Sequence, residues 1–81
     1  MKLDPTPKFK EHFKKLPVKI RAKFYKQAAF LLRDFRYPSL RAKKYNEELG
    51  IWQARVDRNV RFYFLIKDNL YILLDIKKHP K

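Results

Sequence analysis

The hydrophobic pattern of this chain changes its period at Gly50, the only glycine among 81 residues. Before this position, apolar residues recur every three or four places, as on one face of a helix. The two helical stripes are Phe9, Phe13 and Leu16, followed by Ile20, Phe24, Leu31 and Phe35. After Gly50, apolar and polar residues alternate, which is typical of strands with one buried face. The sequence therefore predicts helices first and strands later.

Prolines set the bounds of the predicted helices. Thr6-Pro7 reads as a helix N-cap followed by proline at the first helical position, where a missing N–H costs nothing. Leu16-Pro17 interrupts the first stripe, and Tyr37-Pro38 ends the second. We expect helices at 8–16 and 18–35, folded as an antiparallel hairpin with one apolar side and one basic side.

Three strands are expected at 51–56, 60–66 and 71–77, and a further short strand at 42–45 in the connector 38–50. The turns at 57–59 and 67–70 are rich in turn-forming residues, so the three strands form an antiparallel meander. Its even-numbered residues should face the helices. The expected fold class is α+β: a helical hairpin packed on one face of a small twisted, mainly antiparallel sheet, in a single domain spanning 1–81.

The odd-numbered face of this sheet gathers positive charge. If the first hairpin closes through 57–59, Arg55 lies opposite Arg61, and matching the apolar faces of the next pair puts Arg61 opposite Lys77. Like charges facing each other across strands are destabilising, so this row of three bases predicts an anion-binding site. In the alternative interpretation, Asp75 or an acid of the 47–48 pair neutralises the row.

The same register makes three further predictions. Phe62 should oppose Ile76 and Phe64 should oppose Leu74, with all four side chains on the core face. Three side chains on the other face should stay exposed beside the basic row, where they suit a protein contact: Leu65, Leu73 and Tyr63. Removing Arg61 should relieve repulsion and leave the fold intact.

Charge and composition narrow the function. Lys and Arg number 21 against 8 Asp and Glu, a net charge of +13, which predicts a polyanionic partner, most simply nucleic acid. The absence of cysteine excludes disulfides and thiolate sites, and two histidines without well-placed carboxylates predict no metal. One glycine cannot form a phosphate-binding loop, so no cofactor is expected. The apolar stretches of the chain are far shorter than the ~20 residues that a membrane span needs. The N-terminal segment MKLDPTPKFK lacks the apolar run of a signal peptide. We therefore expect a cytoplasmic protein without membrane contact.

Histidine is the remaining candidate for proton transfer, because imidazole can donate or accept a proton near neutral pH. His79 continues the odd-numbered face beyond Lys77 and is a candidate catalyst. His12 lies on the first predicted helix and is interpreted as structural or solvent-facing.

Three motifs occur along the chain, in the order "F..HFKKLP", "YPSLRAKKY" and "GIWQARVDRNVRFYFLIKDNLYILLDIKKH". Through these motifs, the chain resembles the RelE/ParE superfamily of toxins from about Phe9 to His79. The resemblance implies a helical hairpin on a twisted, mainly antiparallel sheet. It implies a toxin that either cleaves mRNA in the ribosomal A site or inhibits DNA gyrase, and that is neutralised by a cognate antitoxin.

Residue roles follow from the resemblance. Arg61 matches the central arginine that contacts the scissile phosphate, and Arg55 and Gln53 match positions often held by catalytic lysines. His79 matches a C-terminal position held by Arg or His. The resemblance thus implies Arg61, Arg55 and His79 as catalytic, with RNA binding by Lys43, Lys44, Lys77, Gln53 and Tyr63. The sequence departs from the family pattern at Gln53 and in lacking a terminal tyrosine.

Two functions from different classes remain open at this point. The first is a ribosome-dependent endoribonuclease that inhibits translation, with the ribosome, mRNA and an antitoxin as partners. The alternative is a gyrase inhibitor or a catalytically weak homologue that acts only by binding protein or nucleic acid.

Overall fold

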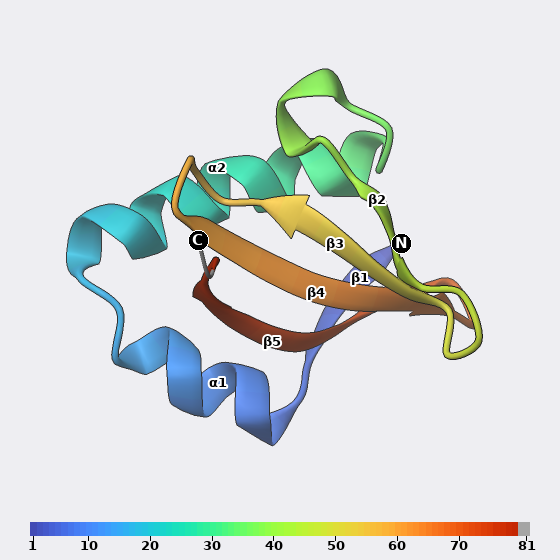
Figure 1. Cartoon of the computed structure of the whole chain (residues 1–81), viewed down its shortest axis with the longest axis horizontal. Coiled ribbons are helices and arrows are strands. Elements are labelled where there is room, and N and C mark those ends of the chain that lie inside the picture. The colour runs from blue at the N-terminus through green and yellow to red at the C-terminus, as the bar shows by residue number, and fades with distance from the viewer. Residues whose placement is uncertain (80–81) are drawn as a thin grey trace.

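Five strands form one mixed sheet in the order β1-β5-β4-β3-β2, with two helices packed against it (Figure 1). The computed structural model describes residues 1–79. The elements in chain order are β1 (Lys2–Pro5), α1 (Pro7–Lys14), α2 (Val18–Arg33), a short 3₁₀ helix η1 (Pro38–Leu40), β2 (Lys43–Asn46), β3 (Ile51–Arg55), β4 (Val60–Lys67) and β5 (Leu70–Lys78). The α+β class predicted from the sequence is confirmed, and the predicted order of helices before strands holds from α1 onward, because β1 precedes the helices.

The two helices begin where the prolines predict and end earlier than expected. The Thr6 hydroxyl accepts a hydrogen bond from the Phe9 N–H at 3.2 Å, which confirms the N-cap. Helix α2 stops at Arg33 because Asp34 adopts an extended backbone, with φ −167° and ψ 118°. Within residues 1–79, neither helix combines the length and the apolarity that a bilayer crossing requires.

The core lies between α2 and one face of the sheet, which we call the covered face. The even-numbered residues of β3 and β4 point into it, as predicted, and the ring of Phe24 on α2 meets that of Phe62 edge-on at 5.3 Å. Helix α1 adds Phe9, whose ring lies 5.3 Å from that of Phe24. The largest side chains that are wholly buried are Phe62, Phe64, Leu31, Leu40, Leu73 and Ile76.

The prediction for β5 holds at Ile76 and is wrong between Tyr71 and Leu74, where the odd-numbered side chains are the buried ones. Phe62 does pair with Ile76, but Phe64 pairs with Leu73, because Leu74 is an extra residue in a β-bulge. The bulge reverses the alternation, so Leu73 is buried in the core at 2% exposure and Leu74 faces the other way. Leu73 is therefore not the exposed contact residue that the sequence suggested, and Tyr63, at 6% exposure, is not exposed either.

The β4–β5 turn explains the bulge. Asp68 and Asn69 have φ angles of 51° and 64°, as a two-residue hairpin turn demands, and the flanking Lys67 and Leu70 pair directly. The pairing of Lys67 with Leu70 at this tight turn and the pairing of Phe62 with Ile76 in the core belong to two registers that differ by one residue. The extra residue reconciles the two registers.

Strand β1 was not predicted, because four residues that include Asp4 and Pro5 carry no strand pattern. It pairs in parallel with β5, from Lys2 beside Leu70 to Pro5 beside Leu73. Since α1 follows β1 directly, α1 lies along the outer edge of β5 (Figure 1). This position lets α1 reach residues on the face of the sheet that α2 leaves uncovered.

Candidate anion-binding site on the open face

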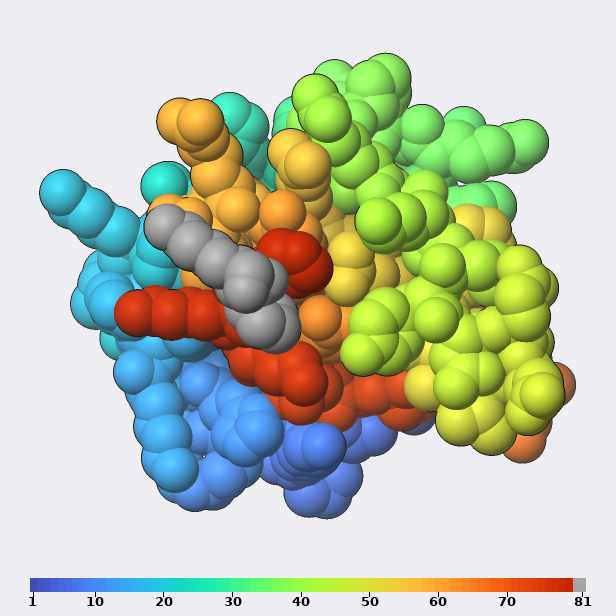
Figure 2. All heavy atoms as spheres, viewed as in Figure 1, coloured from blue at the N-terminus to red at the C-terminus, as the bar shows by residue number. Residues whose placement is uncertain are grey.

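The face of the sheet opposite α2, here called the open face, carries two adjoining hollows. Figure 1 looks onto this face, and Figure 2 shows the end of β5 lying against β3 and β4 there. The cationic hollow, about 310 Å³, is lined by Arg41, Lys43, Gln53, Arg55, Arg61 and His79. The apolar hollow, about 450 Å³, is lined by Thr6, Lys8, Tyr45, Ile51, Tyr63, Leu74, Asp75 and Lys77.

The predicted facing of like charges is confirmed. Arg55 pairs with Arg61 across β3 and β4, and Arg61 pairs with Lys77 across β4 and β5. None of these three bases forms an ion pair with an acid among residues 1–79. Desolvation and the nearby charges of Arg41, Arg61 and Arg58 lower the pKa of Arg55. An anion in the cationic hollow would relieve this repulsion.

Arg61 is held more firmly than the sequence indicated. It is only 6% exposed, and its Nη1 donates to the carbonyls of Asp57 at 2.7 Å, Arg58 at 3.1 Å and Val60 at 3.3 Å. The expectation that Arg61 can be removed without effect on folding is therefore corrected. Its loss would leave turn carbonyls without their charged donor.

The turn that holds Arg61 is itself braced by Asp57. The carboxylate of Asp57 accepts from the N–H groups of Asn59 and Val60, both at 2.8 Å, and lies 3.4 Å from the Lys23 ammonium on α2. Burial alone would raise the pKa of Asp57, but the two N–H donors and Lys23 outweigh it and lower the pKa. The carboxylate stays ionised, so the turn is preorganised at neutral pH.

Gln27 on α2 fixes the opposite side of the hollow. Its buried amide donates to the carbonyls of Arg55 at 2.9 Å and Ser39 at 3.0 Å, and the Ser39 hydroxyl donates back at 3.1 Å. The 3₁₀ helix then ends at Leu40, and its C-cap residue Arg41 adopts a left-handed backbone with φ 46°. These contacts place Arg41 next to Arg55, a neighbour that the sequence pattern did not identify.

His79 reaches the cationic hollow through the backbone. Its N–H donates to the carbonyl of Asn59 at 2.6 Å, which ties the end of β5 to the β3–β4 turn. Gln53 lies on the floor of the hollow at 6% exposure and makes no side-chain hydrogen bond within residues 1–79. The hollow thus combines three guanidinium groups, of which that of Arg61 alone is hydrogen-bonded within residues 1–79, with one ammonium, one imidazole and one amide.

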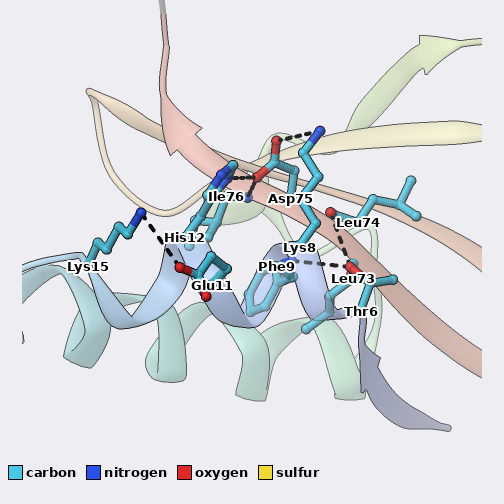
Figure 3. Close-up of polar contacts among 10 residues, drawn as sticks. All are labelled: Thr6, Lys8, Phe9, Glu11, His12, Lys15, Leu73, Leu74, Asp75 and Ile76. Carbon is cyan, nitrogen blue, oxygen red and sulfur yellow. Dashed lines mark hydrogen bonds and ion pairs between the residues drawn. The ribbon is translucent and has the colours of Figure 1, made fainter.

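Asp75 does not neutralise the basic row, contrary to the alternative interpretation. Its Oδ1 accepts from His12 Nδ1 at 2.6 Å and from the Ile76 N–H at 2.8 Å, and its Oδ2 lies 3.6 Å from Lys8 Nζ (Figure 3). Burial alone would raise the pKa of Asp75, but the His12 and Ile76 hydrogen bonds and the charges of His12 and Lys8 lower it. Asp75 is therefore committed to α1, where His12 has the structural role that the sequence suggested.

The structure brings together most of the predicted site residues and separates one. The cationic hollow contains Arg61, Arg55, His79, Gln53 and Lys43, and the apolar hollow contains Tyr63 and Lys77. Lys44 lies apart, with its ammonium 5.0 Å from the Trp52 ring centre and 3.9 Å from Glu47. Adjacent residues of a strand face opposite ways, so Lys43 and Lys44 cannot both enter one hollow. Sequence reasoning missed Arg41, Tyr45 and Ile51 as site residues.

Comparison with known proteins places the fold. No protein-family model and no curated protein sequence matches this chain. A YoeB/ParE toxin from Agrobacterium tumefaciens superposes with a TM-score of 0.83 at 14% identity, over 99% of this chain and 100% of that one. The toxin–antitoxin complex RelBE2 from Mycobacterium tuberculosis gives 0.75 at 22% identity, over 96% of each chain. The isolated RelE toxin of E. coli gives 0.77 at 15% identity, over 98% of this chain and 84% of that one. The chain therefore has the fold of the RelE/ParE toxins.

Proposed function

We propose that this protein is the toxin of a toxin–antitoxin module and that it cleaves mRNA on the ribosome. The observation that carries the proposal is the cationic hollow, in which Arg55 and Arg61 face each other and form no ion pair with an acid of residues 1–79. Phosphodiester RNA is the polyanion that such paired guanidinium groups fit, because each can fork onto two phosphate oxygens. The likeness to solved toxins supports the same assignment.

The reaction that suits these groups is attack of the ribose 2′ oxygen on the adjacent phosphorus. The new bond closes a 2′,3′-cyclic phosphate while the bond from phosphorus to the 5′ oxygen breaks. Arg55 and Arg61 stabilise the negative charge of the pentavalent phosphorane, and the backbone contacts of Arg61 keep it in place before the substrate arrives. His79 is the residue of the hollow best suited to move a proton, to or from a ribose oxygen.

The open geometry of the cationic hollow supports a role for the ribosome in cleavage. The hollow is open, and His79 is exposed, so the protein by itself holds an RNA strand only loosely. Positioning of reacting groups contributes a large part of enzymatic rates. An mRNA held in a ribosomal site would supply that positioning.

The proposed second partner is an antitoxin encoded with the toxin. The net charge of +13 calls for a partner that neutralises it, and the M. tuberculosis structure of the same fold is a toxin–antitoxin complex. Exposed apolar side chains, among them Val18, Tyr25 and Leu49, are available for such a contact.

One observation favours a second candidate, a toxin that acts by binding alone, such as a gyrase inhibitor. Cleavage needs one group to accept the 2′ proton and another to donate to the 5′ oxygen, and His79 is the only imidazole among the residues lining the cationic hollow. A binding-only toxin needs no second proton-transfer group.

The deciding experiment is primer extension on an mRNA translated in a purified system, with DNA supercoiling by gyrase measured in parallel. New mRNA ends that appear only with ribosomes present support the nuclease. Inhibition of supercoiling without new ends supports the alternative. The variant Arg55→Ala should abolish the new ends, whereas Arg33→Ala, an exposed arginine at the end of α2, is the matched control and should leave them unchanged.

A further inference from the structure

The apolar hollow is unexpected on the polar face of a sheet. Its floor is Leu74, which faces outward only because the β-bulge places it there, and Ile51 at the start of β3 adds a second aliphatic wall. At about 450 Å³ the hollow falls within the size range of small-ligand sites. Bulges occur often beside functional sites, where they re-aim a side chain.

Two tyrosines give the hollow flat aromatic walls. The ring of Tyr45 lies 4.9 Å from that of Tyr63, inclined at 64°, and Tyr45 remains 59% exposed. The Lys77 ammonium lies 5.4 Å from the centre of the Tyr63 ring. An exposed tyrosine beside a base-sized apolar space can stack on a planar ring.

Asp75 gives the hollow a chemical preference. Within residues 1–79 it is the only acid that lines either hollow, and it is 7% exposed. His12 and the Ile76 N–H donate to its Oδ1, whereas the only partner of Oδ2 within residues 1–79 is Lys8, at 3.6 Å. The structure therefore presents one carboxylate oxygen that is fixed and able to accept a further hydrogen bond (Figure 3).

The two hollows lie within the span of one nucleotide. Arg61 of the cationic hollow and Tyr63 of the apolar hollow are two residues apart on β4, which is roughly 7 Å along a strand. Gln53, on the floor of the cationic hollow, pairs directly with Tyr63. An RNA strand with a phosphate at Arg61 would carry the neighbouring base over Tyr63.

We propose that the apolar hollow binds one unstacked guanine of the RNA strand, stacked on Tyr45, with its N–H edge donating to Asp75 Oδ2. Guanine fits best because its Watson–Crick edge carries adjacent imino and amino donors and its purine ring offers a large stacking area. A carboxylate would repel phosphate, so its place here suits recognition of a base rather than of the backbone. This inference rests on the proposed function, since it names the base beside the phosphate that the cationic hollow holds.

The test measures binding of fluorescent 2′-O-methyl RNA trinucleotides, which cannot be cleaved, by anisotropy. Their central base is guanine, hypoxanthine, which lacks the amino group, or unsubstituted purine, which lacks both donors. The unaltered protein should bind the guanine trinucleotide about tenfold more tightly than the purine one, with hypoxanthine between them. Equal affinity for all three would overturn the proposal.

Variants separate the contact from the fold. Asp75→Ala should abolish the preference among the three bases, while His12→Ala, which keeps the carboxylate, should retain it. Tyr45→Ala should weaken all three trinucleotides about fivefold, and Tyr25→Ala, an equally exposed tyrosine on α2, is its matched control. Should Asp75→Ala fail to fold, the base series on the unaltered protein and Tyr45→Ala still decide the proposal.

Other outcomes are equally decisive. A preference lost as completely in His12→Ala as in Asp75→Ala would overturn the direct contact and leave Asp75 as a link to α1. If Tyr45→Ala leaves RNA affinity unchanged and weakens antitoxin binding, the hollow belongs to a protein partner and the proposal is wrong. Arg55→Ala should weaken the binding of all three trinucleotides alike. If their binding is unchanged in Arg55→Ala and the base preference persists, the phosphate site of the proposed function is wrong and the guanine site is supported.

Discussion

The two faces of the sheet bury side chains for different reasons. On the covered face, Phe62 and Phe64 are buried by α2 and contribute apolar area alone. On the open face, Gln53, Arg61 and Asp75 are almost as inaccessible, although their side chains are polar or charged. Burial of such groups is costly unless hydrogen bonds satisfy them.

The difference shows how the open face is held. Arg61 and Asp75 have specific partners in the β3–β4 turn and in α1, while the Gln53 amide beside them makes no hydrogen bond within the described residues 1–79. The covered face therefore supplies stability, and the open face uses part of that stability to hold charged groups in fixed positions. Substitutions on the covered face should therefore change stability, and substitutions on the open face should change binding and catalysis.

The largest effect is expected on the covered face. Phe64→Ala should lower the free energy of unfolding by about 3–5 kcal/mol, because it deletes a wholly buried ring from the core. Chemical denaturation followed by circular dichroism measures this change. Leu49→Ala, an exposed apolar side chain, is the control and should change stability by about 0.5 kcal/mol or less. A loss below about 1 kcal/mol for Phe64→Ala would contradict the packing described.

On the open face, Arg55→Ala should remove activity and leave the fold stable. We expect mRNA cleavage to fall by on the order of 10²–10³, as for the loss of one preorganised donor to a developing negative charge. Stability should stay the same or rise slightly, since Arg55 forms no ion pair within residues 1–79 and repels Arg61. The cleavage rate and the melting temperature, measured on the same preparation, test the expected loss of activity and the expected unchanged stability. A fully active Arg55→Ala protein would remove Arg55 from the site.

Arg61→Ala should combine both kinds of loss. It removes a phosphate ligand and also a donor to three carbonyls of the turn, so a destabilisation of about 1–3 kcal/mol is expected. Denaturant titration of Arg61→Ala beside Arg55→Ala measures the difference between the two arginines. Equal stability of the two variants would show that the turn contacts contribute nothing.

Acid should weaken the link between α1 and the open face. The pKa of Asp75 is lowered in the folded state, so its contribution to stability is present above the unfolded-state pKa of ~3.9 and disappears as the pH falls through the folded pKa. The unaltered protein should therefore lose about 1 kcal/mol more than Asp75→Asn on going from pH ~5 to pH ~2. Melting temperatures across this range test it, and parallel curves for the two proteins would argue against the His12–Asp75 contact.

The smallest effect distinguishes two neighbouring lysines. Lys43→Ala should weaken RNA binding about two- to threefold and reduce its salt dependence by about one counterion, because Lys43 lines the cationic hollow. Lys44→Ala should change neither quantity, since Lys44 lies against Trp52. Binding measured at several salt concentrations separates the pair, and equal effects would mean that RNA covers both faces of β2.

Much of the fold was predictable from local patterns. The period change at Gly50, the N-cap at Thr6 and the alternation around Phe62 identified both helices and four of the five strands. The opposition of Arg55 and Arg61 was also predictable, because a short turn between two alternating strands fixes their register. By contrast, β1 is too short and too polar to carry a pattern of its own.

The sequence by itself determined the α+β class, the apolar face of β4 and the excess of positive charge, because periodicity and composition are local properties. The tertiary structure alone decided which charges meet. The bulge at Leu74 follows from a conflict between a tight turn and a distant pairing register, and it exchanges the faces of Leu73 and Leu74. The commitment of Asp75 to His12 needs β1 to place α1 at the edge of β5. The approach of Arg41 to Arg55 needs contacts from three separate elements, which no local pattern in the chain can specify.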